Sequence, residues 1–343
     1  MESQNTKYQT NTNQSWLMHF PIMFFASIMG VGGLSLVASK SIKVFNLTQL
    51  NGLLIALVAL SAFLFCVVAL LYVLKILKYP NAFKKELKHP VRINFFAATS
   101  VSVLIVLMLL LPFIPKSFGI TLFYLGALLQ LIFSLYVVRF WFINEMQQKM
   151  ANPAWFIPIV GNLIVPLAGM QFNTQSYVIP FEILIFYFGM GSFFWILLNA
   201  ALLIRLVFGE NLPQKFLPTL FIFIAPPSVF SLDILMLFGH FSQLQTLYGI
   251  ASASFSIALF FMLLMVSMFG VFRCIKFALS WWAFTFPTAA FTLCALELYA
   301  ISHSKFYAFL GIFGIILTTI IVCIVSFRTL IAIQKREICV LEE

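Results

Sequence analysis

Long apolar stretches alternate with short polar connections along almost the whole chain. A helix that crosses a bilayer needs about 20 predominantly apolar residues, and ten stretches approach or exceed this length. They cover roughly residues 16–39, 46–77, 91–113, 117–147, 154–171, 177–208, 216–239, 243–272, 277–302 and 304–334. The pattern predicts an all-α integral membrane protein with ten transmembrane helices.

Little of the chain lies outside these stretches. Residues 16–334 form the predicted transmembrane domain. Residues 1–15 are rich in Asn, Gln and Thr, and we expect a disordered tail there. Residues 335–343 form a short C-terminal tail, so no soluble domain is expected.

Lysine and arginine concentrate on one side of the predicted bundle. The N-terminus, the connections after the even-numbered helices and the C-terminus carry sixteen of the 20 Lys and Arg residues. The other four are Lys40, Lys43, Lys116 and Lys305. The positive-inside rule assigns the richer side to the cytoplasm. Both termini are therefore predicted to be cytoplasmic, and the short N-terminus and compact loops suggest a bacterial inner membrane.

The composition agrees with a chain that lies in lipid. Apolar residues make up 62% of the chain and charged residues 9%, whereas a soluble domain carries roughly 25% charge. The net charge is +10. Nucleic-acid binding would need a basic patch on a soluble face, and no such face is predicted, so the excess is best explained by topology.

Motifs of enzymes and metal sites are missing. The five cysteines are scattered without CxxC spacing, which indicates neither a zinc site nor a disulfide framework. The sequence contains no HExxH, GxSxG or P-loop motif. We expect no enzymatic activity, no metal and no cofactor.

A proline-bearing aromatic segment recurs in every odd-numbered helix. The segments are Trp16–Pro21, Pro90–Phe96, Pro153–Pro158, Pro218–Pro227 and Trp281–Pro287. One proline of each, taken in order, is separated from the next by 69, 68, 68 and 61 residues, which is one helical hairpin per period. Chance spacing is the alternative. The repeat favours five hairpins in a quasi-fivefold ring around a central pore.

Prolines and small residues also point to the odd-numbered helices as the inner ones. Pro158, Pro226, Pro227 and Pro287 lie within these helices, and a proline inside a span removes a backbone hydrogen bond and kinks the helix. Such breaks are tolerated where they face protein or a water-filled cavity. Ordinary packing is the alternative, because Gly and Pro are frequent in membrane helices generally.

Few ionisable groups are expected at membrane depth. An intramembrane charge is a candidate functional group by default, and Asp233 and Glu297 are the candidates for coupling transport to protons. Purely structural roles for both remain open. Without rings of fixed charge, a pore would be lined by apolar and small hydroxyl groups, which suits anions better than cations, and aromatic residues could close it.

Four segments resemble the slow-anion-channel and tellurite-resistance permease family, which includes fungal malate permeases. They are HPVRINFF at His89–Phe96, NPAWFIPIVGN at Asn152–Asn162, FIAPP at Phe223–Pro227 and IKFALSWWAFTFPTAA at Ile275–Ala290. The resemblance extends from Trp16 to about Arg328.

This resemblance implies a ring of hairpins assembled as a homotrimer with one pore per protomer. It implies that Phe286, directly before Pro287, plugs the pore at mid-membrane. The candidate pore-lining residues are Phe24, Phe25, Gly30, Thr99, Ser100, Pro158, Gly161, Pro226, Pro227, Thr285 and Pro287.

The expected function is a passive channel or uniporter for small monovalent anions such as chloride and nitrate. The alternative is a coupled transporter of C4-dicarboxylates such as malate, or an efflux permease for tellurite- or sulfite-type oxyanions. The chain departs from the bacterial permeases at Ser100 (their proline), Asn199 (their glutamate) and Ala26 (their glycine), and these differences bear on pore radius and selectivity.

Overall fold

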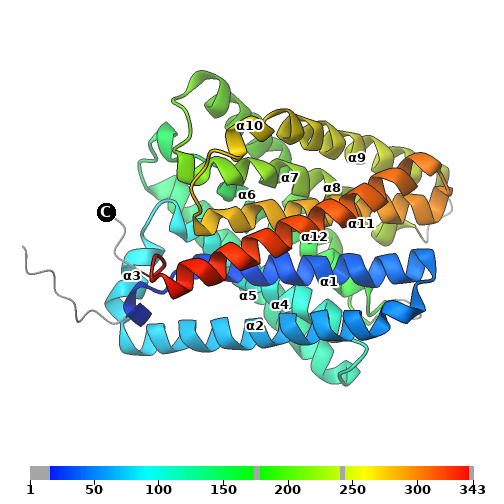
Figure 1. The fold of residues 1–343 in the computed structure, drawn as a ribbon, viewed down its shortest axis with the longest axis horizontal. Coiled ribbons are helices and arrows are strands. Elements are labelled where there is room, and N and C mark those ends of the chain that lie inside the picture. The colour runs from blue at the N-terminus through cyan, green and yellow to red at the C-terminus, as the bar shows by residue number, and fades with distance from the viewer. Residues whose placement is uncertain (1–15, 174–177, 240–243, 340–343) are drawn as a thin grey trace, which may run out of the picture.

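The computed structural model describes residues 16–173, 178–239 and 244–339, and every regular element in these ranges is a helix. The predicted tail at 1–15 lies outside the described residues. The α-helices are α1 Phe25–Phe45, α2 Asn51–Lys78, α3 Pro80–Leu87, α4 Ala97–Leu110, α5 Lys116–Ile143, α6 Phe156–Met170, α7 Phe181–Phe208, α8 Ala225–Phe238, α9 Leu244–Ser267, α10 Phe269–Phe272, α11 Thr285–Ser302 and α12 Lys305–Gln334 (Figure 1).

The prediction of ten apolar spans is confirmed within the described part of the chain. The largest shift in boundaries concerns the first span, which runs over Ile22–Phe45 instead of 16–39. Lys40 does not end this helix because it forms an ion pair with Glu297 of α11. The helix ends at Asn46, whose left-handed backbone (φ 54°) caps it.

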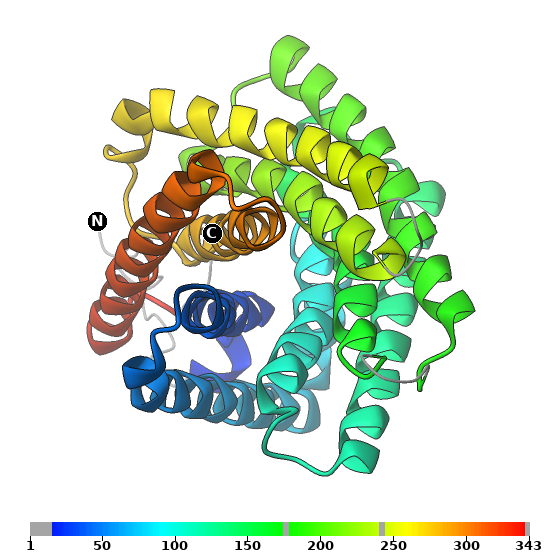
Figure 2. The same cartoon turned by 90° about the vertical axis from the view of Figure 1, so that its right-hand side faces the viewer.

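The odd-numbered spans lie inside the bundle and the even-numbered spans outside. In the most apolar part of each odd span, 61–89% of the residues are buried, against 17–39% in the even spans. Seen end-on, α1 and α11 lie inside while α2, α9 and α12 lie at the edge (Figure 2). The packing therefore shows the separation into inner and outer spans that the proline repeat predicts.

Contacts among the inner helices follow a closed order. Helix α1 packs against α4, α4 against α6, α6 against α8, α8 against α11, and α11 against α1. Each outer helix packs on the inner helix that precedes it in the chain: α2 on α1, α5 on α4, α7 on α6, α9 on α8 and α12 on α11. The chain thus consists of five helical hairpins, each contributing one inner helix.

Every inner span begins as a 3₁₀ helix and continues as an α-helix. The 3₁₀ segments are Ile22–Phe24, Arg92–Phe96, Pro153–Trp155, Gln214–Ile224 and Leu279–Phe284. They coincide with or adjoin the proline-bearing aromatic segments of the sequence. Long 3₁₀ runs are uncommon and often mark functional positions, and the one at Gln214–Ile224 has 11 residues.

The repeated prolines act differently from the expected mid-helix kinks. Pro158, Pro226 and Pro287 occupy the second or third position of α6, α8 and α11. In the first turn a missing N–H costs little, so these prolines mark the change from 3₁₀ to α geometry. Pro166 is the proline that lies inside an inner α-helix.

A buried ion pair fixes the N-terminal segment to α2 and α3. The Glu86 carboxylate accepts hydrogen bonds from Lys75 Nζ (2.5 Å), Tyr72 Oη (3.0 Å) and the backbone N–H of Ile22 (3.0 Å). Lys75 also donates to the Phe20 carbonyl at 2.7 Å. Lys75 and Glu86 are each 3% exposed, so this charge pair depends on the protein for its partners.

We expect Glu86→Ala to lower the free energy of unfolding by about 3–5 kcal/mol, because it leaves the Lys75 ammonium buried without its counter-charge. The double variant Lys75→Met, Glu86→Leu should recover most of the loss. Thermal unfolding of the purified protein in detergent measures both, with the exposed Glu145→Ala as the control. Equal stability of Glu86→Ala and the control would contradict the anchoring role.

Candidate functional site

A small cavity lies where the five inner spans meet. Each of the five inner spans contributes to its wall. The lining residues are Ala26, Met29, Phe95, Val101, Phe156, Ile157, Val160, Gly161, Ile164, Ile222, Ala225, Leu279, Ser280, Trp282, Ala283, Phe286 and Pro287. Its volume is about 50 Å³, enough for only a few water molecules. Its wall is almost wholly apolar, with Ser280 as the one side chain that carries a hydroxyl. We call it the central cavity.

Phe286 borders the central cavity from α11. It remains partly exposed although its neighbours Thr285 and Pro287 are buried. A Cβ added at Gly33 of α1 would lie 3.6 Å from Cδ2 of Phe286, at ordinary van der Waals distance. The ring therefore packs close to α1 and also borders the central cavity.

A larger cavity of about 220 Å³ lies at the end of the bundle that carries both chain termini. We call it the vestibule. Its wall includes four basic side chains, His19, His89, Arg92 and Lys215, and one acidic side chain, Glu337. Leu279 and Ser280 line both the vestibule and the central cavity, so the two spaces adjoin along one segment of the chain.

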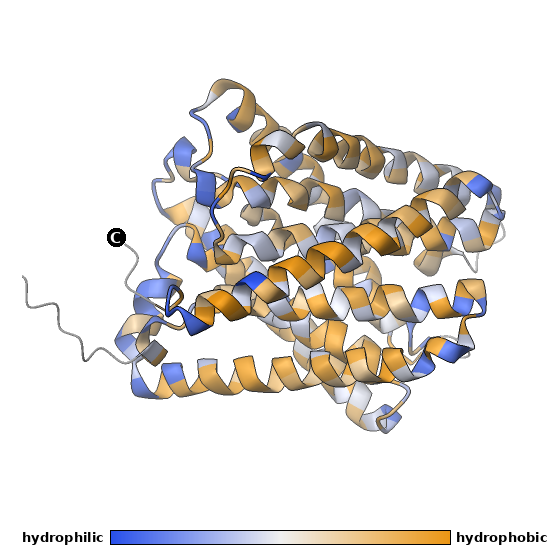
Figure 3. Ribbon diagram, viewed as in Figure 1, coloured by the Kyte–Doolittle hydropathy of each residue, from blue (hydrophilic) through white to orange (hydrophobic). Residues whose placement is uncertain are grey.

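Electrostatics make the vestibule positive. All five inner spans begin at this end, and helix N-termini carry partial positive charge. Burial, with Lys75 and Arg92 nearby, holds the pKa of His19 below its usual value. The fixed charges of the wall are those of Arg92, Lys215 and Glu337. Hydrophilic residues lie at both ends of the bundle, more of them at this end, while the middle of the bundle is apolar (Figure 3).

Three of the predicted site residues meet at the central cavity: Phe286, Pro287 and Gly161. Gly30 and Thr285 lie next to it at the contact of α1 with α11, where a Cβ on Gly30 would lie 2.9 Å from Thr285 Cβ. Ala26, one of the departures from the bacterial permeases, lines the cavity itself. The structure thus brings these residues together at or beside the central cavity, and their role in a pore stays a prediction.

Other predicted pore-lining residues face neighbouring helices. Phe25 and Thr99 border a separate cavity beside α2 and α5, and Phe24 stacks on Phe20 with ring centroids 4.6 Å apart. Ser100 donates to Gln130 Oε1 at 2.6 Å.

The remaining prolines are engaged through their backbone. The Pro158 carbonyl accepts from Gln130 Nε2 and Ser134 Oγ, at 2.8 and 2.7 Å, and the Pro227 carbonyl accepts from Ser254 Oγ at 2.8 Å. Pro226 is buried at the start of α8. None of these prolines lines the central cavity.

The two acidic candidates for coupling differ in their surroundings. Glu297 is about a quarter exposed and pairs with Lys40, linking α11 to α1. Asp233 in α8 is fully buried, and neither of its carboxylate oxygens has a hydrogen-bond partner among the described residues. A buried carboxylate without a donor is costly when charged, so Asp233 is the less explained of the two.

A polar network between α4, α5 and α6 was not foreseen from the sequence. Gln130 and Ser134 of α5 bond to Ser100, Asn162 and the Pro158 carbonyl. A Cβ on Gly161 would lie 2.7 Å from Gln130 Nε2. The outer helix thus fixes the stretch of α6 whose opposite face lines the central cavity.

The fold and the two adjoining cavities define a polytopic helical membrane protein with an apolar central cavity and a vestibule whose wall is rich in basic side chains. Comparison with known families agrees with this class. A family model described as voltage-dependent anion channel (SLAC1) matches residues 19–330. The chain belongs to this family.

Individual relatives come from plants, archaea and fungi. The S-type anion channel SLAH3 of Arabidopsis thaliana is 30% identical over 76% of this chain and 41% of its own length. An uncharacterized transporter of Methanocaldococcus jannaschii is 28% identical over 88% of this chain and 91% of its own. The malic acid transport protein of Schizosaccharomyces pombe is 26% identical over 88% and 76%. The chain spans about half the length, or less, of the first two plant relatives.

Proposed function

We propose that this protein is a passive channel for small monovalent anions such as chloride and nitrate. In this proposal anions enter through the vestibule and cross the central cavity. The Phe286 ring blocks their path when it lies across the lumen and opens it when the ring swings away. The observation that carries the proposal is that Leu279 and Ser280 join a positive vestibule to an apolar cavity walled by all five inner spans.

Physical chemistry favours anions over cations in this passage. No acidic side chain lines the central cavity, and the basic side chains of the vestibule outnumber its one acid. An apolar constriction resists hydrated ions until it widens. Positive potential at the mouth attracts anions and raises their local concentration.

The five inner helices would form a quasi-fivefold ring around this passage, and three protomers would assemble with one pore each. The closed order of inner-helix contacts supports the ring. The family resemblance supports the homotrimer. The distribution of Lys and Arg supports cytoplasmic termini in a bacterial inner membrane.

We expect Phe286→Ala to raise anion current severalfold, because removing the ring widens an apolar constriction that otherwise excludes hydrated ions. Voltage clamp of oocytes or planar bilayers measures the current. Phe327→Ala on α12 is the matched control, since that side chain is 64% exposed on the outer surface. An unchanged current at equal surface amounts would refute the gate.

A coupled carrier for malate-like dicarboxylates is the second candidate, favoured by the unpartnered Asp233 and by the malic acid transport relative. An oxyanion efflux permease of the tellurite or sulfite type belongs to the same coupled class.

Passive transport predicts that proteoliposomes dissipate a nitrate gradient with no change in lumenal pH. It also predicts that Asp233→Asn leaves the rate of nitrate flux within about twofold of the wild-type rate, because the substitution removes no pore-lining group. A pH dye in the lumen measures proton movement. Protons moving with the anion in the wild type, and not in Asp233→Asn, would favour the coupled carrier instead.

A further inference from the structure

We infer that the protein holds one anionic phospholipid between α2, α3 and α5, in the leaflet on the side of the chain termini. The observation is an apolar cavity of about 390 Å³, the lateral groove, that lies apart from the proposed anion passage. Its walls include Val73 and Ile76 of α2, Phe83 and Leu87 of α3, and Ile132 and Tyr136 of α5.

The lateral groove opens toward lipid. Both α2 and α5 are outer helices that pack against α4. At the rim, Val73 is 51%, Ile132 48% and Tyr136 39% exposed. The groove lies along the last turns of both helices, near the end of the bundle that carries the termini. Because its wall is almost entirely apolar, an acyl chain is a better occupant than water.

The helix α3 supplies the polar half of the site. Its residues Phe83 and Leu87, four positions apart, face the groove, while Lys84, Lys85 and Lys88 are exposed. The buried Glu86 ties α3 to Lys75 and Tyr72 of α2. These bonds fix α3, which carries Lys84 and Lys85, next to the groove that Phe83 and Leu87 line.

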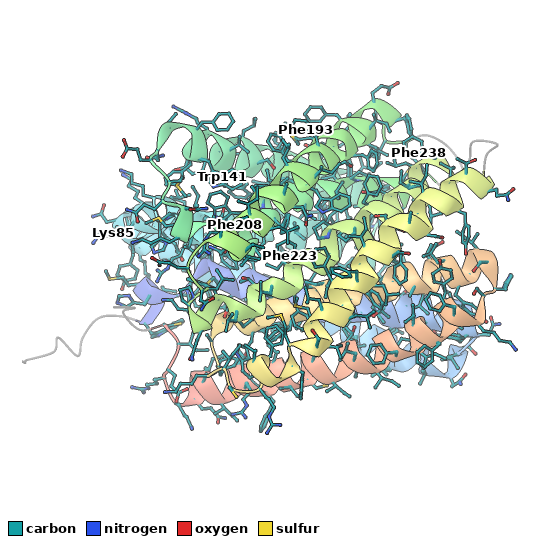
Figure 4. All side chains as sticks on the ribbon, turned by 90° about the horizontal axis from the view of Figure 1, so that it is seen from above. Lys85, Trp141, Phe193, Phe208, Phe223 and Phe238 are labelled. Atoms are coloured by element: carbon teal, nitrogen blue, oxygen red, sulfur yellow. The ribbon has the colours of Figure 1, made fainter. Side chains whose placement is uncertain are left out.

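Charge complementarity selects the kind of lipid. Lys78, at the end of α2, and Lys88, directly after α3, add two cations to Lys84 and Lys85 of α3. Lys85 projects at this end of the bundle (Figure 4). Clusters of four or more basic residues next to a membrane helix attract anionic headgroups. An apolar groove whose wall includes α3, which carries part of this cluster, matches a phospholipid with a negative headgroup and one chain inserted.

The groove shares a wall with the central cavity. Phe25 lines the groove, whereas its neighbour Ala26 lines the central cavity. In the same way, Phe96 lines the groove and Phe95 lines the central cavity. Only one layer of inner helix therefore separates the lipid from the lumen. This site does not depend on which anion crosses the membrane.

Native mass spectrometry of the protein from nanodiscs containing phosphatidylglycerol and phosphatidylcholine with identical chains tests the proposal. The wild type should retain phosphatidylglycerol in preference to phosphatidylcholine. The variant Lys84→Gln, Lys85→Gln, Lys88→Gln should lose that preference. Its control is Lys149→Gln, Arg273→Gln, Lys276→Gln, which removes three exposed charges elsewhere at the same end and should keep it.

Filling the groove tests the acyl-chain half of the site. Ala69→Trp should abolish lipid retention, whereas Leu263→Trp, on an outward face of α9 that is 60% exposed, should not. If Ala69→Trp does not fold, Val73→Trp at the rim replaces it. The proposal is overturned if Ala69→Trp retains as much lipid as the wild type. It is also overturned if both triple variants lose the preference for phosphatidylglycerol to the same extent. A smaller oligomer in Ala69→Trp would also overturn it, because a second copy of the chain would then fill the groove.

Discussion

The structure depends on one constraint of the bilayer: each backbone N–H and C=O at membrane depth needs a partner within the protein. The five inner spans change from 3₁₀ to α pairing inside the bundle, where a backbone group can lose its usual partner. Serine or threonine side chains donate to nearby carbonyls at four of these changes. The bonds are Ser27 to Phe24 (2.6 Å), Ser100 to Ala97 (2.8 Å), Ser228 to Ile224 (2.8 Å) and Thr285 to Trp282 (2.7 Å). In the third inner span, Asn162 donates to the Ile159 carbonyl (2.9 Å) within the first half of α6.

The same constraint explains why the irregular segments belong to the inner helices, which line the central cavity. Irregular helix geometry is tolerated only where protein or a cavity surrounds it, so the outer helices α2, α5, α7, α9 and α12 are long and mostly apolar. The changes of geometry fall at similar depth in all five inner spans, and the central cavity lies among them. Phe286 borders the central cavity at this level, which is where the proposed channel would widen.

Much of this arrangement could be predicted from the sequence. The lengths of the apolar stretches predicted the spans. The proline-bearing segments predicted which helices are inner and which are outer, because their regular spacing can be read directly along the sequence. The face of each residue was harder to predict: Phe25 and Ala26 are neighbours, yet they line different cavities because successive helical residues point about 100° apart. The Gln130 network and the Lys75–Glu86 pair could not be foreseen, since each depends on which helices meet.

The central claim is that anions cross the central cavity. The native cysteines are first replaced by serine, and Ala225→Cys, at the cavity, is compared with Ala69→Cys, in the lateral groove, in the Phe286→Ala background. An anionic methanethiosulfonate added from the side of the chain termini should stop anion flux through Ala225→Cys, because the attached sulfonate narrows the lumen and repels anions. It should leave Ala69→Cys conducting. Modification of Ala225→Cys with no loss of flux would show that anions take another route.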